Sequence, residues 1–260
     1  MSTPRSIKPA PPAKPFLTAK WTNLIFCSYA VSDATLAPYL PSHLELDRWE
    51  GRAYASVVAF DFSETYIRGR VVPDLPNLRS FPELNLRFYV RQDDKRGVIF
   101  VREFVPNPLV AGLARAWFNE PYAAAKLTRT ITPDGAGGRL VRHTLVWQGN
   151  EQHVGVAVPE GEPQTPGPAE FATWVKEQPW GFGRTRHDQP TRFRVSHPAW
   201  QTYPVTGCEI TLDFAALYGD RWNFLRDRAP DSVLFAEGSP VMVYRSEPAG
   251  PGPKKERGRG

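Results

Sequence analysis

The sequence is short of cysteine: Cys27 and Cys208 are the only two among its 260 residues. They are far apart in the chain, and the proline-rich N-terminus lacks the apolar stretch of a secretory signal. Because disulfides follow oxidising compartments, we expect two free thiols in a cytoplasmic protein. No apolar run approaches the roughly 20 residues of a membrane-spanning helix. We therefore expect no membrane span.

The signatures of several enzyme classes are also missing. There is no HExxH or CxxC, and the five histidines are not spaced as zinc ligands. No GxSxG marks a nucleophilic serine. The glycines of GFGRTR (181–186) follow a predicted helix rather than a strand, so this segment is interpreted as a loop. The sequence thus predicts neither a metal site nor a cofactor.

The excess positive charge is confined to the two ends of the chain. Residues 1–20 carry four Lys and Arg and no acid, and residues 251–260 carry four against one Glu. Of the net charge of +5, a net −2 therefore remains on residues 21–250. Sequence-specific nucleic-acid binding requires a basic folded face and is not expected. We predict disordered tails at 1–15 and 247–260, around one domain at 16–246.

Short segments in which apolar and polar residues alternate dominate the predicted domain. In ELNLRFYVR (83–91), Glu83, Asn85 and Arg87 alternate with apolar residues, as in a strand with one apolar and one polar face. Similar patterns predict strands over 52–62, 97–105, 139–148, 153–158, 192–196, 208–214 and 232–245, the last with a turn at Glu237–Pro240. The pattern predicts an α+β protein that is mostly β, with an antiparallel sheet that is either open or closed into a barrel or cone.

Helices are fewer and flank the strands. Asn107 and Pro108 form a helix start, after which Leu109, Leu113 and Trp117 recur along one face. Pro121 repeats this start and predicts a helix over 121–127. Two shorter helices are predicted over 168–178 and 214–227.

Two groups of residues are candidates for chemistry. The polar face of 83–91 would meet water on an open sheet, whereas in a closed barrel it would line a cavity that recognises polar ligands. On the predicted helix, Tyr122 and Lys126 share one face, with Arg115 nearby in sequence. A lysine becomes a nucleophile when burial or a neighbouring cation lowers its pKa, and is otherwise a surface charge. HPAW (197–200) is interpreted as structural packing.

The order of several motifs resembles one known family. FPELNLRFYV, GVIF, AR followed by EPY, and HPAW, together with the early WTNLIFCSYA, are similar to the YqjF-like DUF2071 family. The resemblance extends from about Lys20 to Tyr244. This family is grouped with the acetoacetate decarboxylase-like fold, which implies a β-rich, cone-like barrel around a central pocket and favours the closed interpretation of the Glu83 face. Relatives of this fold are often oligomeric, so a homo-oligomer remains an open alternative.

The resemblance also assigns roles to residues. Glu83 corresponds to a glutamate of acetoacetate decarboxylases, and Tyr122 follows a proline where those enzymes have their Schiff-base lysine. A phenol cannot form an imine. The preferred hypothesis is a protein that binds a small polar or acidic organic ligand through Glu83, Asn85, Arg87, Arg115 and Tyr122. If it catalyses a reaction, Glu83 would be the acid/base and Tyr122 the proton donor.

Two alternatives belong to other functional classes. In the first, the protein is a lyase or decarboxylase in which Lys126 replaces the missing amine. In the second, it is a non-catalytic interaction protein whose basic tails make the contacts.

Overall fold

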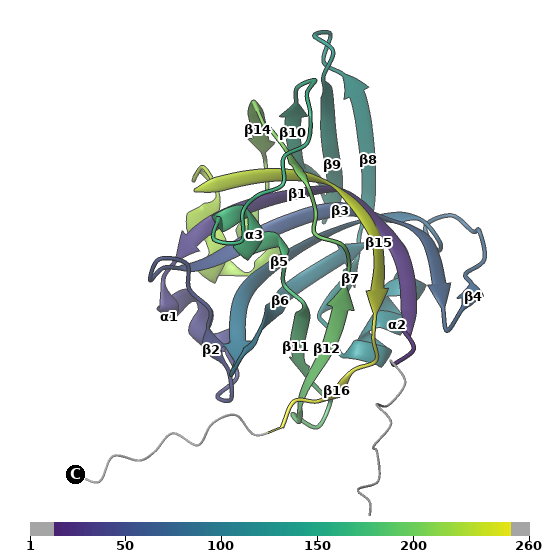
Figure 1. Ribbon diagram of the computed structural model, residues 1–260, viewed down its shortest axis with the longest axis vertical. Helices are drawn as coiled ribbons and strands as arrows, with labels where there is room; N and C mark the ends of the chain where they lie inside the picture. The colour runs from purple at the N-terminus through teal and green to yellow at the C-terminus, as the bar shows by residue number, and fades with distance from the viewer. Residues whose placement is uncertain (1–12, 251–260) are drawn as a thin grey trace, which may run out of the picture.

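A strongly curved sheet closes into a ring and forms the body of the protein (Figure 1). The computed structural model describes residues 13–250, so most of both predicted tails lies outside the described residues. Around the ring follow β15 (Ser232–Val243), β1 (Leu17–Val31), β3 (Ala53–Ile67), β5 (Phe81–Gln92), β6 (Lys95–Val105), β11 (Trp180–Arg184) and β12 (Pro190–Ser196). Pairing of β12 with β15 closes the ring. The predicted closed, mostly β architecture is confirmed.

The strands of the ring are joined by very different numbers of residue pairs. Eleven residue pairs join β1 to β15, whereas two join β12 to β15. Two pairs also join β11 to β6, and these strands are parallel. The hairpin of β11 and β12 is therefore held by short pairings on both of its ring flanks.

Short strands extend the ring: β2 (Glu45–Leu46), β4 (Arg70–Val71), β7 (Tyr122–Ala124), β13 (Thr202–Tyr203) and β16 (Glu247–Pro248). β16 falls in the predicted C-terminal tail, so the predicted boundary at residue 247 is wrong. Its backbone pairs with β12, and the carboxylate of Glu247 lies 2.8 Å from Nε of Arg192. Ala249 behind it is buried. These contacts join segments that are far apart in sequence. They extend the folded region past the boundary that amino-acid composition predicted.

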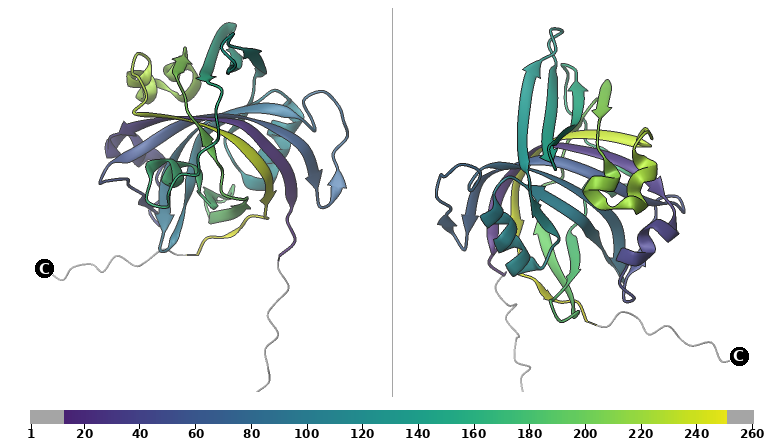
Figure 2. Two further views of the ribbon diagram at one scale, coloured as in Figure 1. Left: turned by 45° about the horizontal axis from the view of Figure 1, so that its top comes forward. Right: turned by 180° about the vertical axis from the view of Figure 1, so that it is seen from behind.

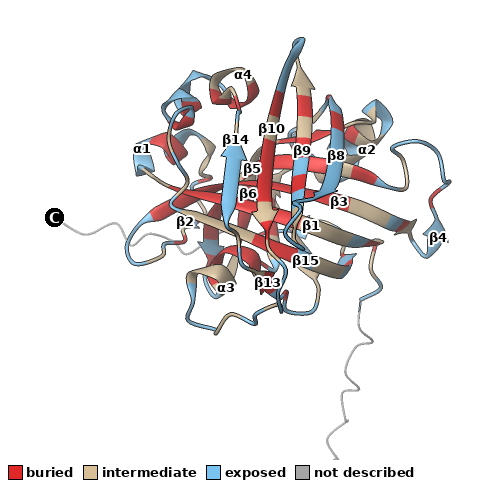
Figure 3. Cartoon of the chain, turned by 90° about the horizontal axis from the view of Figure 1, so that it is seen from above, coloured by how far each residue is buried: buried red, intermediate tan, exposed pale blue. Residues whose placement is uncertain are grey.

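A second sheet stands on the outside of the ring (Figures 1 and 2). It consists of β14 (Gly207–Ile210), β10 (Asn150–Val158), β9 (Arg139–Trp147) and β8 (Lys126–Pro133). Figure 3 shows a largely buried β10 and a mostly exposed β8. The strand predicted over 208–214 ends at Ile210, and Asp213 caps α4 (Phe214–Tyr218) by accepting a hydrogen bond from the Ala216 amide.

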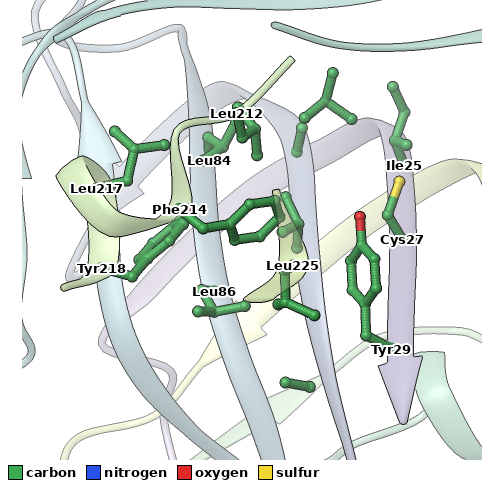
Figure 4. Packing of buried hydrophobic residues seen from close by; sticks show 14 of the residues in the cluster. Ile25, Cys27, Tyr29, Leu84, Leu86, Leu212, Phe214, Leu217, Tyr218 and Leu225 are labelled. Carbon is green, nitrogen blue, oxygen red and sulfur yellow. The ribbon is translucent and has the colours of Figure 1, made fainter. Parts of the chain in front are cut away.

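The larger hydrophobic core fills the space between the ring and these outer elements. Because side chains alternate along a strand, Leu84, Leu86 and Phe88 of β5 all enter this core. Figure 4 shows Leu84 and Leu86 beside Phe214 of α4. The short 3₁₀ helix η2 (Asp220–Leu225) contributes further apolar side chains. The opposite side chains of β5 consequently point into the ring.

The predicted helix after Asn107 is confirmed as α2 (Pro108–Phe118), with the Asn107 side chain accepting from the Leu109 amide. Its predicted apolar face is correct at Leu113 and Trp117, which line the ring interior, and wrong at Leu109. Leu109 is 58% exposed, whereas Val110 and Phe118 join the cavity wall; Trp117 is 41% exposed although it also lines the cavity. The remaining helices are α1 (Asp33–Leu36), the 3₁₀ helix η1 (Ala37–Tyr39) and α3 (Phe171–Lys176), the last shorter than predicted.

The helix predicted over 121–127 is wrong. Asn119 adopts a left-handed conformation that ends α2, and residues 122–124 then form β7 alongside β6. Pairing with a distant strand overrides the local helix propensity of the alanines. The turn predicted at Glu237–Pro240 is also absent, because β15 continues through it with Gly238 at φ +90°.

The two cysteines lie much closer together than the sequence suggests. Both are free, and their Sγ atoms are 4.0 Å apart, with Cys27 on β1 and Cys208 on β14. Within residues 13–250, none of the helices has the length and apolar character needed to cross a membrane.

Candidate functional site

A cavity of about 170 Å³ lies inside the ring, on the side of β5 that faces away from the larger core. Its wall is mainly apolar and aromatic, with contributions from β1, β3, β5, β6, β12 and α2. Aromatic lining residues include Trp21, Phe26, Phe60, Phe62, Phe81 and Phe100. Polar side chains gather at two places on this wall. This combination is typical of sites for small organic molecules.

The first polar group, which we call the acid cluster, consists of Glu83, Glu103, Glu120 and Tyr122. Strand pairing assembles it. Glu103 of β6 lies opposite Asn85 of β5, which places it diagonal to Glu83. On the other neighbouring strand of β6, Glu103 lies opposite Tyr122 of β7. Glu120 immediately precedes β7. The three glutamates are 2%, 2% and 6% exposed.

Hydrogen bonds hold one member of the acid cluster in place. Asn85 donates from Nδ2 to Oε1 of Glu83 at 3.1 Å, and the Tyr122 hydroxyl donates to Oε2 at 3.3 Å. Among the described residues, Oε1 of Glu103, Oε1 of Glu120 and Oδ1 of Asn85 are buried without a partner. Buried polar atoms in folded proteins usually have partners, so these are free to contact a ligand.

Burial dominates the electrostatics of the acid cluster. It raises the pKa of Glu83 to about 7, although hydrogen bonds from Asn85 and Tyr122 partly offset it. Burial also raises the pKa of Glu120 to about 8. Glu103 has its pKa raised well above the usual range by burial and by the charges of the other two glutamates. The acid cluster therefore retains protons near neutral pH, and can both donate and accept them.

Burial and the nearby glutamates likewise raise the pKa of Tyr122 well above its ordinary value. Its phenol stays protonated at neutral pH and acts as a hydrogen-bond donor. An imine cannot form at this oxygen.

The second polar group comprises Arg87, Lys176, Gln178 and His197, which also line the cavity. Lys176 at the end of α3 is 3% exposed and donates to Oε1 of Glu177 at 2.6 Å. The same Glu177 oxygen accepts the amide of Trp200, which fixes its position. Glu177 thus pairs with Lys176, whereas Arg87 has no carboxylate within ion-pair distance among the described residues.

His197 is held flat against Trp200, with ring centroids 3.8 Å apart and an interplanar angle of 9°. Burial lowers the pKa of His197, and the charges of Lys176 and Arg87 lower it further. HPAW, interpreted from the sequence as packing, thus also contributes a side chain to the cavity wall.

The structure brings together four of the predicted site residues and separates two. Glu83, Asn85 and Arg87 share the cavity-facing side of β5, and Tyr122 joins them from β7. Arg115 is an exposed residue of α2 whose guanidinium donates to the Tyr122 carbonyl at 3.3 Å, and it is not part of the cavity wall.

Lys126 is exposed at the start of β8 and lies outside the cavity wall as well. The predicted helix would have placed it one turn from Tyr122, but the strand positions it on the outer sheet. Its position gives no support to a lyase that uses this amine.

Polar residues of the cavity that were not predicted include Glu103, Glu120, Lys176, Gln178 and His197. Glu103 follows Arg102 in the mostly apolar segment 97–105, and a charge in such a segment was the available signal. The others are brought in by loops and by the end of a helix, where no periodicity marks the buried side. Among residues 13–250, no three His, Cys, Asp or Glu are arranged to hold a metal ion.

Comparisons with known proteins agree on one family. The model of the family described as DUF2071, an uncharacterized conserved protein, matches residues 18–240. YqjF of Bacillus subtilis is 36% identical over 107 residues, which is 41% of this chain and 43% of YqjF. The aligned part thus spans less than half the length of that relative.

Solved structures with this fold are more distant in sequence. Acetoacetate decarboxylase from Legionella pneumophila matches with a TM-score of 0.59 at 14% identity, over 96% of this chain and 92% of that one. An acetoacetate decarboxylase-like enzyme from Sphingomonas wittichii matches with a TM-score of 0.58 at 16% identity, over 95% and 100%. The enduracididine biosynthesis enzyme MppR, complexed with pyruvate, matches with a TM-score of 0.60 at 14% identity, over 95% and 94%. With the family model covering most of its length, this chain belongs to the DUF2071 family and has the acetoacetate decarboxylase-like fold.

Proposed function

We propose that this protein binds a small polar organic molecule, in particular an organic acid, in its cavity, and exchanges a proton with it at the acid cluster. One observation carries the proposal: three buried carboxyl groups and the phenol of half-buried Tyr122 meet inside an apolar cavity. Burying three such groups together is costly for folding. Groups of this kind are concentrated where proteins bind or transform ligands.

The acid cluster suits a ligand with a carbonyl or hydroxyl oxygen. Protonated Glu103 and Glu120 donate hydrogen bonds, and their free oxygens point to no other described partner. The solved MppR structure contains pyruvate, a keto acid, which supports this class of ligand by analogy of fold.

The proposed proton transfer uses Glu83 as the base. Its carboxylate takes a proton from the carbon next to the ligand carbonyl, and the C–H electrons form a carbon–carbon double bond. The carbonyl oxygen then receives a proton from Glu103 and becomes an enol. A pKa of about 7 leaves Glu83 able to take up and return the proton at neutral pH. When the proton on Glu83 is replaced by one from solvent before the step reverses, the keto form returns with its carbon-bound hydrogen exchanged.

Proton NMR in heavy water tests binding and exchange together. We expect keto acids from a panel that includes pyruvate to bind and to exchange their carbon-bound hydrogen for deuterium. Glu83→Gln should keep the binding and slow the exchange about 100-fold or more, because the amide cannot act as the base. Glu151→Gln, at an exposed position of β10, is the matched control.

Two results would contradict the proposal. In the first, no member of the panel binds the wild type. In the second, Glu83→Gln exchanges hydrogen as fast as the wild type, which would remove Glu83 from the chemistry.

A further inference from the structure

The cavity has a second polar end that the proposed proton transfer does not use. This end is lined by Arg87, Lys176 and His197. Arg87 lies four residues along β5 from Glu83, Lys176 ends α3, and His197 follows β12. Of these, Lys176 is nearly completely buried, and burial of a lysine is rare without a partner or a ligand.

The charges at this end are not balanced within the described residues. Glu177 is paired with Lys176, and its second oxygen is 3.8 Å from Nδ1 of His197. Arg87 has no carboxylate partner among residues 13–250; its Nη2 donates to the Val175 carbonyl at 3.0 Å, and its Nε is buried without a partner. One positive charge therefore remains uncompensated beside the cavity.

Aromatic rings and an amide complete this end of the cavity. The Arg87 guanidinium carbon is 5.3 Å from the ring centroid of Phe26 and 5.8 Å from that of Tyr89. Gln178 is 7% exposed, and its Oε1 has no partner in the part of the chain that the structure describes. A guanidinium held between rings keeps a fixed orientation, which suits recognition of a planar carboxylate.

We propose that Arg87, Lys176 and His197 form a carboxylate-binding subsite, so that the ligand is a keto or hydroxy acid with its two polar groups at opposite ends of an apolar chain. The inference rests on the proposed function, because it takes the acid cluster as the site of the oxygen at the other end. The apolar walls between the two ends contact the chain of the ligand.

The strand sets the length of this ligand. Residues four apart on a strand, such as Glu83 and Arg87, have Cα atoms roughly 13 Å apart. With about 3 Å taken by a hydrogen bond at each end, roughly 7 Å remains, or about five to six carbon–carbon bonds. The apolar cavity of about 170 Å³ includes side chains from both ends in its wall.

Three probes of equal length separate the two ends: 7-oxooctanoate, 2-octanone without the carboxylate, and octanoate without the ketone. By calorimetric titration of the full-length wild type, we expect 7-oxooctanoate to bind about tenfold or more tightly than 2-octanone, as charge-assisted hydrogen bonds predict. Octanoate should lie in between. This comparison needs no variant and so does not depend on the folding of one.

A pair of lysine variants then locates the subsite. Lys176→Met should reduce the affinity for 7-oxooctanoate about tenfold and leave that for 2-octanone unchanged. Lys126→Met removes an exposed lysine outside the cavity and should change neither. Lys176→Arg keeps the charge and should retain most of the affinity.

The outcomes distinguish the subsite from the proposed function. Equal binding of 7-oxooctanoate and 2-octanone, or an equal loss of both in Lys176→Met, would overturn the subsite and leave binding at the acid cluster intact. Absence of binding by all three probes would overturn both. Borohydride reduction followed by mass spectrometry adds a third check: a covalent adduct on Lys176 would show a nucleophile in place of a carboxylate-binding ammonium, and would overturn the subsite.

Discussion

Replacing Glu120 by glutamine should stabilise the protein at alkaline pH, by an amount that grows as the pH rises. Burial raises the pKa of this carboxyl from 4.5 to about 8 in the folded protein. Between these values the folded protein keeps the proton, whereas the unfolded chain has already released it. The unfolding free energy of the wild type therefore falls as the pH rises through this window.

The structure gives the size of the effect. The interval from 4.5 to about 8 corresponds to about 5 kcal/mol at 1.36 kcal/mol for each pH unit. Small domains have roughly 5–15 kcal/mol of stability in total, so the change is large. Glu120→Gln has nearly the same shape and cannot ionise, and it also removes a charge that acts on Glu103. Below about pH 4.5 both proteins should be similarly stable.

Urea unfolding at a series of values between about pH 5 and about pH 9 measures this difference directly. We expect the variant to gain several kcal/mol relative to the wild type across the series. Glu151→Gln, which changes an exposed carboxyl of β10, should show no such trend and serves as the control. A difference between Glu120→Gln and the wild type that stays constant with pH would refute the assignment of a buried, protonated carboxyl.

Further predictions concern the cysteines, a glycine and the chain ends. Hydrogen peroxide should oxidise Cys27 and Cys208 to one disulfide, with both thiol hydrogens leaving in water, because their sulfurs are already 4.0 Å apart. The readout is a mass loss of about 2 Da that is absent in Cys208→Ser. Two titratable thiols after peroxide treatment would contradict this prediction. Gly238→Ala should lower the unfolding free energy by more than about 2 kcal/mol, because the new Cβ would clash with the backbone of β1 at a residue with φ +90°. Gly51→Ala, at φ +77° with open space around it, should lower the unfolding free energy by about 1 kcal/mol. Equal losses of unfolding free energy in urea would exclude the clash. Deleting both terminal segments outside the described residues should change the affinity for keto acids by no more than about twofold, because the protein charges proposed to contact the ligand lie inside the ring. A larger loss of affinity in calorimetric titration would favour a role for the basic tails.

Local patterns in the sequence predicted the features that depend on neighbouring residues. Alternation along 83–91 identified both faces of β5, and Asn107 with Pro108 identified the start of α2. The helix expected after Pro121 failed because Tyr122 pairs with Glu103, a contact between distant segments that helix propensity does not contain.

The candidate site divides along the same line. Glu83, Asn85 and Arg87 follow one another along a single strand, so their common face was visible in the sequence. Glu120 and Lys176 reach the cavity through a loop and a helix end whose positions depend on how the ring closes. A resemblance to proteins of the same fold located Tyr122, but composition could not have shown that three carboxyl groups share its surroundings.

The small number of residue pairs that join the β11–β12 hairpin to its ring neighbours has a consequence for ligand access to the cavity. Trp180 and Gly181 of β11 and Phe193 and Val195 of β12 belong to the cavity wall, yet two residue pairs on each side join this hairpin to its ring neighbours. Segments with few pairings open at the lowest free energy. Amide hydrogens of this hairpin should thus exchange with solvent sooner than those along β1 and β3. We therefore expect this hairpin to be the part of the cavity wall that opens most readily.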